Sequence, residues 1–175
     1  MRKHILTLAL ALAGLTVGTA HAASPLHLLA RDTHGHLTLN GVPLGVPVAS
    51  FAPACQGDPT AATPPCVLTT PEIDGYGFAQ VFGLPAVKDG AGRPVFSGAN
   101  VTTHNGVVDG VHLVFADDRY VTLFRTATNE TVGLADFTDR NGVMEWHGVL
   151  KDAYIVLVPE GEGAAFGVVQ EDPTP

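Results

Sequence analysis

Short apolar segments alternate with turn residues along the chain once the first 22 residues are passed. The segments are rich in Val, Leu, Phe and Thr, and they are separated by glycines and prolines, of which the whole chain has 20 and 13. No stretch after residue 22 keeps apolar residues at the i, i+3, i+4 and i+7 spacing of an amphipathic helix for three turns. The pattern therefore predicts an all-β domain of short strands joined by tight turns, with helix as a minor component at most.

Asn-Gly pairs mark three expected turns, at residues 40–41, 105–106 and 141–142. Both central residues of a type I′ turn need positive φ, which Asn and Gly tolerate, and this turn matches the twist of a hairpin. Further tight connections are expected at 117–118 and 151–152. The predicted strands are 36–39, 46–51 (an edge strand, because of its proline), 76–83, 99–104, 107–115, 120–125, 131–138, 143–150, 154–158 and 164–169.

Pairing across residues 117–118 suggests how these strands are arranged. A hairpin there would set Phe115 opposite Tyr120 and Val114 opposite Val121, so both of its faces would be largely apolar. Such a strand is covered on both sides or lines a ligand cavity. We therefore expect an antiparallel meander that closes as a small β-barrel, with a β-sandwich as the alternative.

The first 22 residues have the layout of a cleavable signal peptide. Arg2 and Lys3 form a positive start, an apolar run covers residues 5–17, and Ala20-His21-Ala22 is a small-x-small cleavage pattern. The run is short of the ~20 residues that span a bilayer. We expect residues 23–175 to form one periplasmic or secreted domain without a membrane span, ending in a short flexible tail from about residue 170.

Composition adds a strong acidic balance. The formal net charge is −8 at pH 7, and the mature chain is more acidic still because Arg2 and Lys3 belong to the leader. The electric field of such a chain repels nucleic acid and anionic membrane surfaces, so neither is an expected partner. A small molecule or a partner protein remains, and the charge can also simply serve solubility.

The two cysteines, Cys55 and Cys66, flank ten residues that have neither a helix nor a strand pattern. Disulfides persist in exported proteins, and a metal or redox pair would favour a C-x-x-C spacing instead. We therefore predict one disulfide-stapled loop.

Two groups of side chains have the chemistry of a divalent-metal site. The first is His34 with His36, because residues two apart on a strand point the same way. The second is Asp136, Glu145 and His147, which a hairpin would bring to one face. Either group can instead be a solvated strand end or strand face.

The second group depends on the register of that hairpin. A two-residue type I′ loop at 141–142 would pair Phe137 with Trp146 and Asp136 with His147. The resulting cluster could bind a metal or orient the imidazole for acid–base work.

Three aromatic residues are candidates for lining a ligand pocket: Tyr120, Phe137 and Trp146. Their more common role in a small domain is to fill the core.

No motif in the chain is specific enough to fix a reaction. None of the serines lies in a G-x-S-x-G elbow, and the glycine-rich stretch 89–93 lacks the spacing of a phosphate loop. The leading expectation is therefore a non-catalytic, exported domain that binds a small molecule or a partner protein, with no cofactor other than a possible divalent metal. The alternatives are a metal-binding protein or metal-dependent enzyme built on the clusters above, an enzyme inhibitor, and a structural component of the cell envelope.

Overall fold

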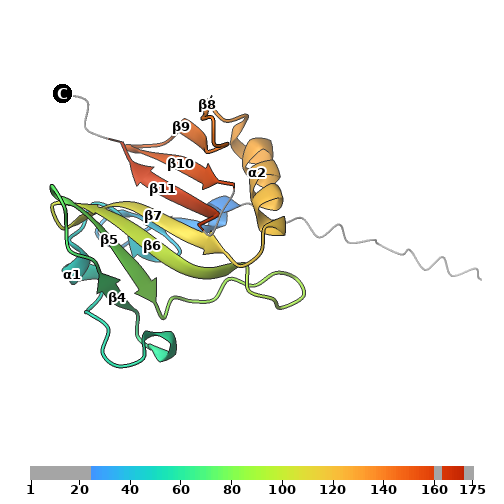
Figure 1. The fold of residues 1–175 in the computed structure, drawn as a ribbon. Helices are drawn as coiled ribbons and strands as arrows, with labels where there is room; N and C mark the ends of the chain where they lie inside the picture. Colours follow the sequence, from blue (N-terminus) through green and yellow to red (C-terminus); the bar gives the residue numbers. More distant parts are fainter. Residues whose placement is uncertain (1–24, 160–162, 172–175) are drawn as a thin grey trace, which may run out of the picture.

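The computed structural model describes residues 25–159 and 163–171. The predicted signal peptide, residues 1–22, lies outside the described residues, as do residues 172–175 of the predicted tail. The described chain is mostly β, as the sequence predicts (Figure 1). Its strands are β1 (Leu29–Arg31), β2 (Leu37–Leu39), β3 (Val42–Pro43), β4 (Cys66–Thr69), β5 (Tyr76–Phe82), β6 (Phe96–His104), β7 (Val107–Phe115), β8 (Phe137–Thr138), β9 (Met144–Leu150), β10 (Ala153–Val158) and β11 (Ala165–Gln170). The helical elements are two 3-10 turns, η1 (Pro25–Leu28) and η2 (Pro59–Ala61), and two α-helices, α1 (Val48–Phe51) and α2 (Arg119–Val132).

The strands form two antiparallel sheets. One has the order β1-β2-β3, and the other has the order β4-β5-β6-β7-β11-β10-β9-β8. The outer strands of the large sheet, β4 and β8, do not pair with each other, so the predicted closure into a barrel is wrong. The meander breaks because the chain leaves β7 into helix α2, and β11 rather than the next segment pairs with β7.

Helix α2 replaces the predicted strand 120–125 and the first two residues of the predicted strand 131–138, of which only Phe137 and Thr138 form a strand, β8. The Asp117 carboxylate accepts the backbone N–H of Arg119 at 3.0 Å, and Gly133, with φ +101°, ends the helix. The segment is rich in Thr and Val, which favour strands locally, but Tyr120, Val121 and Thr128 bury one face of the helix. Tertiary packing therefore overrides a weak local propensity.

Without a hairpin at 117–118, β7 has other partners than predicted. Phe115 lies opposite Phe96 of β6, and Val114 lies opposite Ala165 of β11. The predicted edge strand 46–51 is also wrong, because its last four residues form helix α1 and Pro47 makes a single bridge to Val107.

The other strand predictions are confirmed to within a few residues, and β7 matches at both ends. Two of the three Asn-Gly turns are confirmed as well. Asn40 and Gly41 have φ values of +48° and +82°, and Asn105 and Gly106 have +51° and +74°. These are the values of a type I′ turn. The connection at 151–152 joins β9 to β10 as predicted.

One face of the large sheet carries the hydrophobic core. A row of buried side chains crosses six strands in register: Val67, Val81, Ala99, Leu113, Phe166 and Leu157. Leu39 and Val42 of the small sheet belong to the same core. Helix α2 lies beside the end of the sheet that contains β8 to β11 (Figure 1). The opposite face of the large sheet is more polar. The first hollow described below has lining residues from both faces, and the second borders the polar face.

Candidate functional site

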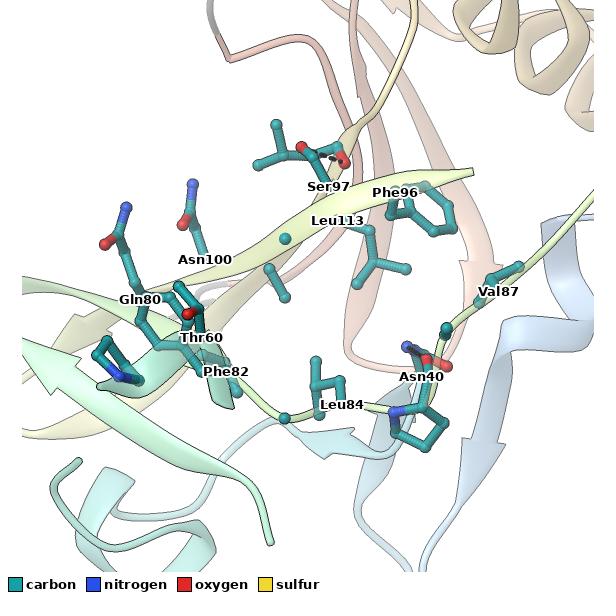
Figure 2. Close-up of a pocket in the computed structure, with 18 residues that line it drawn as sticks. Asn40, Thr60, Gln80, Phe82, Leu84, Val87, Phe96, Ser97, Asn100 and Leu113 are labelled. Carbon is teal, nitrogen blue, oxygen red and sulfur yellow. Dashed lines mark hydrogen bonds between the residues drawn. The ribbon is translucent and has the colours of Figure 1, made fainter. Parts of the chain in front are cut away.

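A hollow of about 510 Å³ opens where β5 and β6 separate (Figure 2). The two strands pair as far as Val81 and Ala99, while β6 extends further back to Phe96, where it pairs with β7. Among the described strands, none pairs with β6 on its β5 side over residues 96–98. The connection 83–95 leaves the sheet at this point and forms part of the wall.

The floor of the hollow reaches the hydrophobic core. Val81, Ala99 and Leu113 line it, and each is less than 5% exposed. Apolar walls come from side chains such as Leu84 and Phe96, which Figure 2 shows on the same side as Leu113. The hollow therefore offers a ligand apolar surface at core depth.

The rim of the hollow is polar but uncharged. Gln80 and Asn100 are cross-strand partners, and Figure 2 shows their side-chain amides projecting side by side, away from Leu113 and Leu84. Asn40 and Thr60 line the opening from two other segments. No Asp, Glu, Lys, Arg or His is among the 18 residues that line the hollow, although the chain as a whole carries a net charge of −8.

The disulfide-stapled loop forms one wall. Cys55 and Cys66 are bonded, which confirms the predicted pairing. Between them, the Asp58 carboxylate caps η2 by accepting the N–H and the hydroxyl of Thr60 at 2.9 and 2.7 Å. These bonds lower the pKa of Asp58. They also fix the turn that brings Pro59 and Thr60 to the hollow.

Gly83, the residue directly after β5, packs closely against that loop. Its φ is +75°, and a Cβ at this position would lie 2.6 Å from the carbonyl oxygen of Ala62 and 3.2 Å from Cα of Pro65. Only glycine fits such a conformation and such a close approach. On another side, the side-chain amide of Asn40 donates to the carbonyl of Pro85 at 3.3 Å and ties the β2–β3 turn to the wall.

This arrangement can bind and orient a ligand. The apolar floor favours an apolar group, and the rim amides can donate and accept hydrogen bonds. Because no titratable side chain lines the hollow, its residues are not equipped to take up or release a proton.

The hairpin that sequence reasoning singled out has a different register from the predicted one. Phe137 lies opposite Glu145, and Thr138 lies opposite Met144, so the loop is 140–142. Gly142 has φ +79°, whereas Asn141 does not adopt positive φ. The two-residue type I′ loop, and with it the pairing of Phe137 with Trp146, is therefore wrong.

Asp139 explains the longer loop. Its carboxylate accepts the backbone N–H groups of Asn141 and Val143 at 2.8 and 2.9 Å, and its carbonyl accepts that of Gly142 at 3.1 Å. This is a type I turn followed by a glycine with positive φ, which is the common three-residue hairpin.

Asp136, Glu145 and His147 nevertheless come together. Asp136 accepts the backbone N–H of His147 at 2.7 Å, not a ring N–H as a side-chain pair would require. The imidazole lies 3.0 Å from Glu145 through Nε2 and 3.2 Å from Glu171 through Nδ1. The ring also stacks on Tyr154 at 4.6 Å. The hydrogen bond to Glu145, followed by that to Glu171, raises the pKa of His147.

Glu171 is the member that sequence reasoning missed. It follows β11 and falls in the segment predicted as a tail, and its approach to His147 depends on the order β9-β10-β11. No local signal in the sequence gives that order.

His34 and His36 lie in the connection between β1 and β2, not on a strand. Gly35 between them has φ +88°. The backbone N–H groups of His34 and His36 both donate to one carboxylate oxygen of Asp32, at 2.8 and 2.9 Å. The His36 ring lies 2.9 Å from the other oxygen, and this bond is the main cause that lowers the pKa of Asp32. The two imidazole centroids are 6.1 Å apart.

The five predicted metal ligands thus fall into two groups: His34 and His36 in the connection between β1 and β2, and the other three at the β8–β9 end of the large sheet. Within residues 25–159 and 163–171, no three His, Cys, Asp or Glu side chains are arranged to hold a metal ion.

None of the three predicted aromatic ligand residues lines the hollow. Trp146 is 1% exposed, and its Nε1–H donates to the carbonyl of Gly133 at 3.0 Å and the side chain of Asn129 at 3.2 Å. Tyr120 is also buried, and its hydroxyl donates to Asp89. Phe137 is half exposed. The first two therefore fix helix α2 and the loop after residue 88 to the core.

No protein family, curated protein or solved structure matches the chain. In the part of the chain that the structure describes, no helix has the length and apolar character needed to cross a membrane.

The sequence does carry one signal for the hollow. Residues 82–87 read Phe-Gly-Leu-Pro-Ala-Val, an apolar run that the glycine and the proline prevent from continuing the strand. An apolar loop directly after a strand is a candidate wall for a pocket.

Proposed function

We propose that this protein is an exported, non-catalytic binding protein that holds a neutral, partly apolar small molecule in the hollow between β5 and β6. The observation that carries the proposal is the lining itself. A floor at core depth opens, where β5 and β6 separate, towards a rim of uncharged polar side chains, and no charged side chain lines the hollow in an otherwise acidic chain.

The size and composition of the hollow suit such a ligand. Small-molecule sites are typically about 300–1,000 Å³, mostly apolar, with a few polar groups that fix orientation. At about 510 Å³ the hollow lies within this range. A charged ligand would lose its hydration without gaining an opposite charge from the lining.

Recognition is assigned to two features of the rim. The amides of Gln80 and Asn100 each provide donors and an acceptor for a carbonyl, hydroxyl or amide of the ligand. The exposed stretch of β6 at Ser97 and Gly98, which no described strand covers on the β5 side, gives a ligand access to the strand edge.

The proposed export rests on the signal peptide predicted for residues 1–22, and the disulfide supports it. A disulfide persists in the periplasm or outside the cell and would be reduced in most cytosols. Here the disulfide closes the loop that carries Pro59 and Thr60 to the hollow, so an oxidising compartment would preserve the wall of the proposed site.

Blocking the hollow tests the proposal. Gly98 lines it, and a Cβ at Gly98 would meet no atom within 4 Å. Gly98→Trp should therefore fold and fill the opening. Gly90→Trp is the matched control, because Gly90 is equally open but lies outside the lining.

Nile red, a neutral and polarity-sensitive dye, is the probe, followed by fluorescence titration and by NMR shifts of the Gln80 and Asn100 side-chain amides. Gly98→Trp should weaken binding at least about tenfold, while Gly90→Trp should leave it unchanged. The absence of saturable binding, equal binding by both variants, or shifts that map elsewhere would overturn the proposal.

A further inference from the structure

A second hollow, of about 420 Å³, lies away from the first and shares no lining residue with it. Side chains from β5, β6, β7, β10 and the end of β11 line it, among them Tyr76, His104, Asp109, Tyr154, Val169 and Glu171. We refer to it as the tyrosine groove. We propose that the tyrosine groove is a binding site for an organic cation, meaning a ligand with an ammonium group.

The two tyrosines provide aromatic surfaces, and each is backed by a histidine. Tyr76 stacks on His104 with ring centroids 4.7 Å apart and planes within 5°. Tyr154 stacks on His147 at 4.6 Å and 25°. The stacking holds each phenol ring in place, and Tyr76 remains 62% exposed. The face of a tyrosine ring attracts a cation within about 6 Å of its centroid.

Two carboxylates supply the opposite charge. Asp109 Oδ1 accepts the hydroxyl of Thr102 at 2.6 Å, and Glu171 Oε1 is bonded to the His147 ring at 3.2 Å. These contacts orient both groups. No Lys or Arg is among the residues that line the groove. The lining is therefore anionic at neutral pH, and the negative charge of the whole chain adds attraction for a cation.

The same observations favour an organic cation over a metal ion. A metal site needs several ligand atoms that converge, and no such set of three exists in the described residues. An ammonium group is satisfied by a more dispersed arrangement of carboxylates and aromatic faces. In the strand order, Tyr76 of β5 and Tyr154 of β10 lie at the two ends of the groove, and Asp109 of β7 and Glu171, which follows β11, lie between them. Val107 and Val169 give the carbon skeleton of the ligand an apolar surface.

An NMR titration at mildly alkaline pH, where His147 carries less positive charge than at neutral pH, tests the proposal. The probes are choline and 1,5-diaminopentane, and 3,3-dimethylbutan-1-ol is the uncharged analogue of choline. A further probe is Nα-acetyl-lysine methylamide, in which the side-chain amine is unmodified. It distinguishes a lysine side chain from a free amine as the source of the ammonium group. At least one cationic probe should shift the backbone amides of Asp109 and Val169 saturably. The neutral alcohol should bind at least about tenfold more weakly than choline if choline binds.

Substitutions in the groove complete the test. Asp109→Asn and Glu171→Gln keep an oxygen that accepts the present hydrogen bonds but remove the charge, and each should weaken cation binding about fivefold. Glu130→Gln, on the exposed surface of α2, is the matched control and should change nothing. Nile red binding in the first hollow should be unaffected by these variants, so failure here is distinguishable from failure of the proposed function. If neither choline, the diamine nor the lysine derivative binds, or if all variants bind alike, the proposal is wrong.

Discussion

Asp136 accepts the backbone N–H of His147 through its carboxylate, at 2.7 Å. Strand β8 consists of Phe137 and Thr138 alone, so it pairs with only the first two residues of β9. Beyond the end of this short strand, the Asp136 carboxylate accepts a hydrogen bond that a longer β8 would accept through its backbone. It thereby satisfies an N–H group at the edge of the sheet. An edge donor that is paired in this way is less open to strand addition from another chain.

Removing that carboxylate should destabilise the end of the sheet. Asp136→Ala should lower the free energy of unfolding by about 1–2 kcal/mol, because a charge-assisted hydrogen bond is lost at a solvent-accessible position. Asp136→Asn, which retains an oxygen acceptor, should cost less. Urea unfolding of both variants measures the difference, and equal losses would contradict the assigned role.

The imidazole of His147 should respond mainly to Glu145. Glu145→Gln removes the carboxylate whose hydrogen bond contributes most to the raised pKa of His147, so this pKa should fall towards its ordinary value. Asp136→Asn should have a smaller effect, because Asp136 bonds the backbone and not the ring. NMR titration of the His147 ring protons measures both, with Glu130→Gln as control. A larger shift in Asp136→Asn than in Glu145→Gln would contradict the geometry.

The same histidine gives stability a defined pH dependence. The pKa of His147 is raised in the folded state, so the protonated imidazole stabilises the fold. This stabilisation is complete below the unfolded-state pKa of about 6.5 and is lost as the pH rises through the folded-state pKa. In wild type, stability should therefore fall over this window relative to His147→Gln. Urea midpoints of the two proteins across mildly acidic to mildly alkaline pH test this. Parallel curves would show that the bonds to Glu145 and Glu171 add nothing.

Gly83 should tolerate substitution less well than another glycine of the same region. Gly83→Ala imposes both a positive φ and a contact of 2.6 Å with the Ala62 carbonyl oxygen, so it should cost about 2–4 kcal/mol. Gly57→Ala, with φ +73° and no atom within 4 Å of the added Cβ, should cost only about 1 kcal/mol. Thermal unfolding compares the two. Gly83→Ala should also weaken Nile red binding, because it displaces the disulfide-stapled loop.

Trp146 should be sensitive to the loss of its indole N–H alone. Trp146→Phe leaves the Gly133 carbonyl and the Asn129 side chain without this donor and leaves a space in the core, at a cost of about 2–4 kcal/mol. Hydrogen exchange should show faster opening of the C-terminal turn of α2. Unchanged protection there would mean that the indole does not anchor the helix.

Opening the disulfide should loosen the wall of the first hollow. The double variant Cys55→Ser with Cys66→Ser frees a loop of sequence separation 11, which corresponds to a loss of roughly 3 kcal/mol on the loop-entropy account. Chemical denaturation gives the stability, and thiol counting on the unreduced wild type should find no free thiol. Nile red should bind more weakly to the double variant. Unchanged affinity would remove the loop from the proposed site.

Features set by neighbouring residues were predictable from the sequence. Strand β7 has the predicted ends, because alternation of apolar residues and an Asn-Gly turn define it locally. The disulfide was predictable for a similar reason, since two cysteines flanking a patternless segment have only each other. Asn141-Gly142 shows the limit of this reasoning. The same dipeptide forms a different loop there, because the Asp139 side chain holds the turn.

Features set by distant partners were decided by the tertiary structure. Residues 119–132 have the β-branched composition of a strand but form a helix, because burying Tyr120 and Thr128 gains more than local propensity costs. The first hollow exists because β5 and β6 part at Val81, and Glu171 meets His147 because β11 lies between β7 and β10. Turn and strand preferences act over a few residues of the chain, whereas strand order and cavities depend on contacts between segments far apart in sequence. The sequence by itself therefore determined three of the five predicted turns, the disulfide and most strands, and only the packed core decided where binding surfaces form.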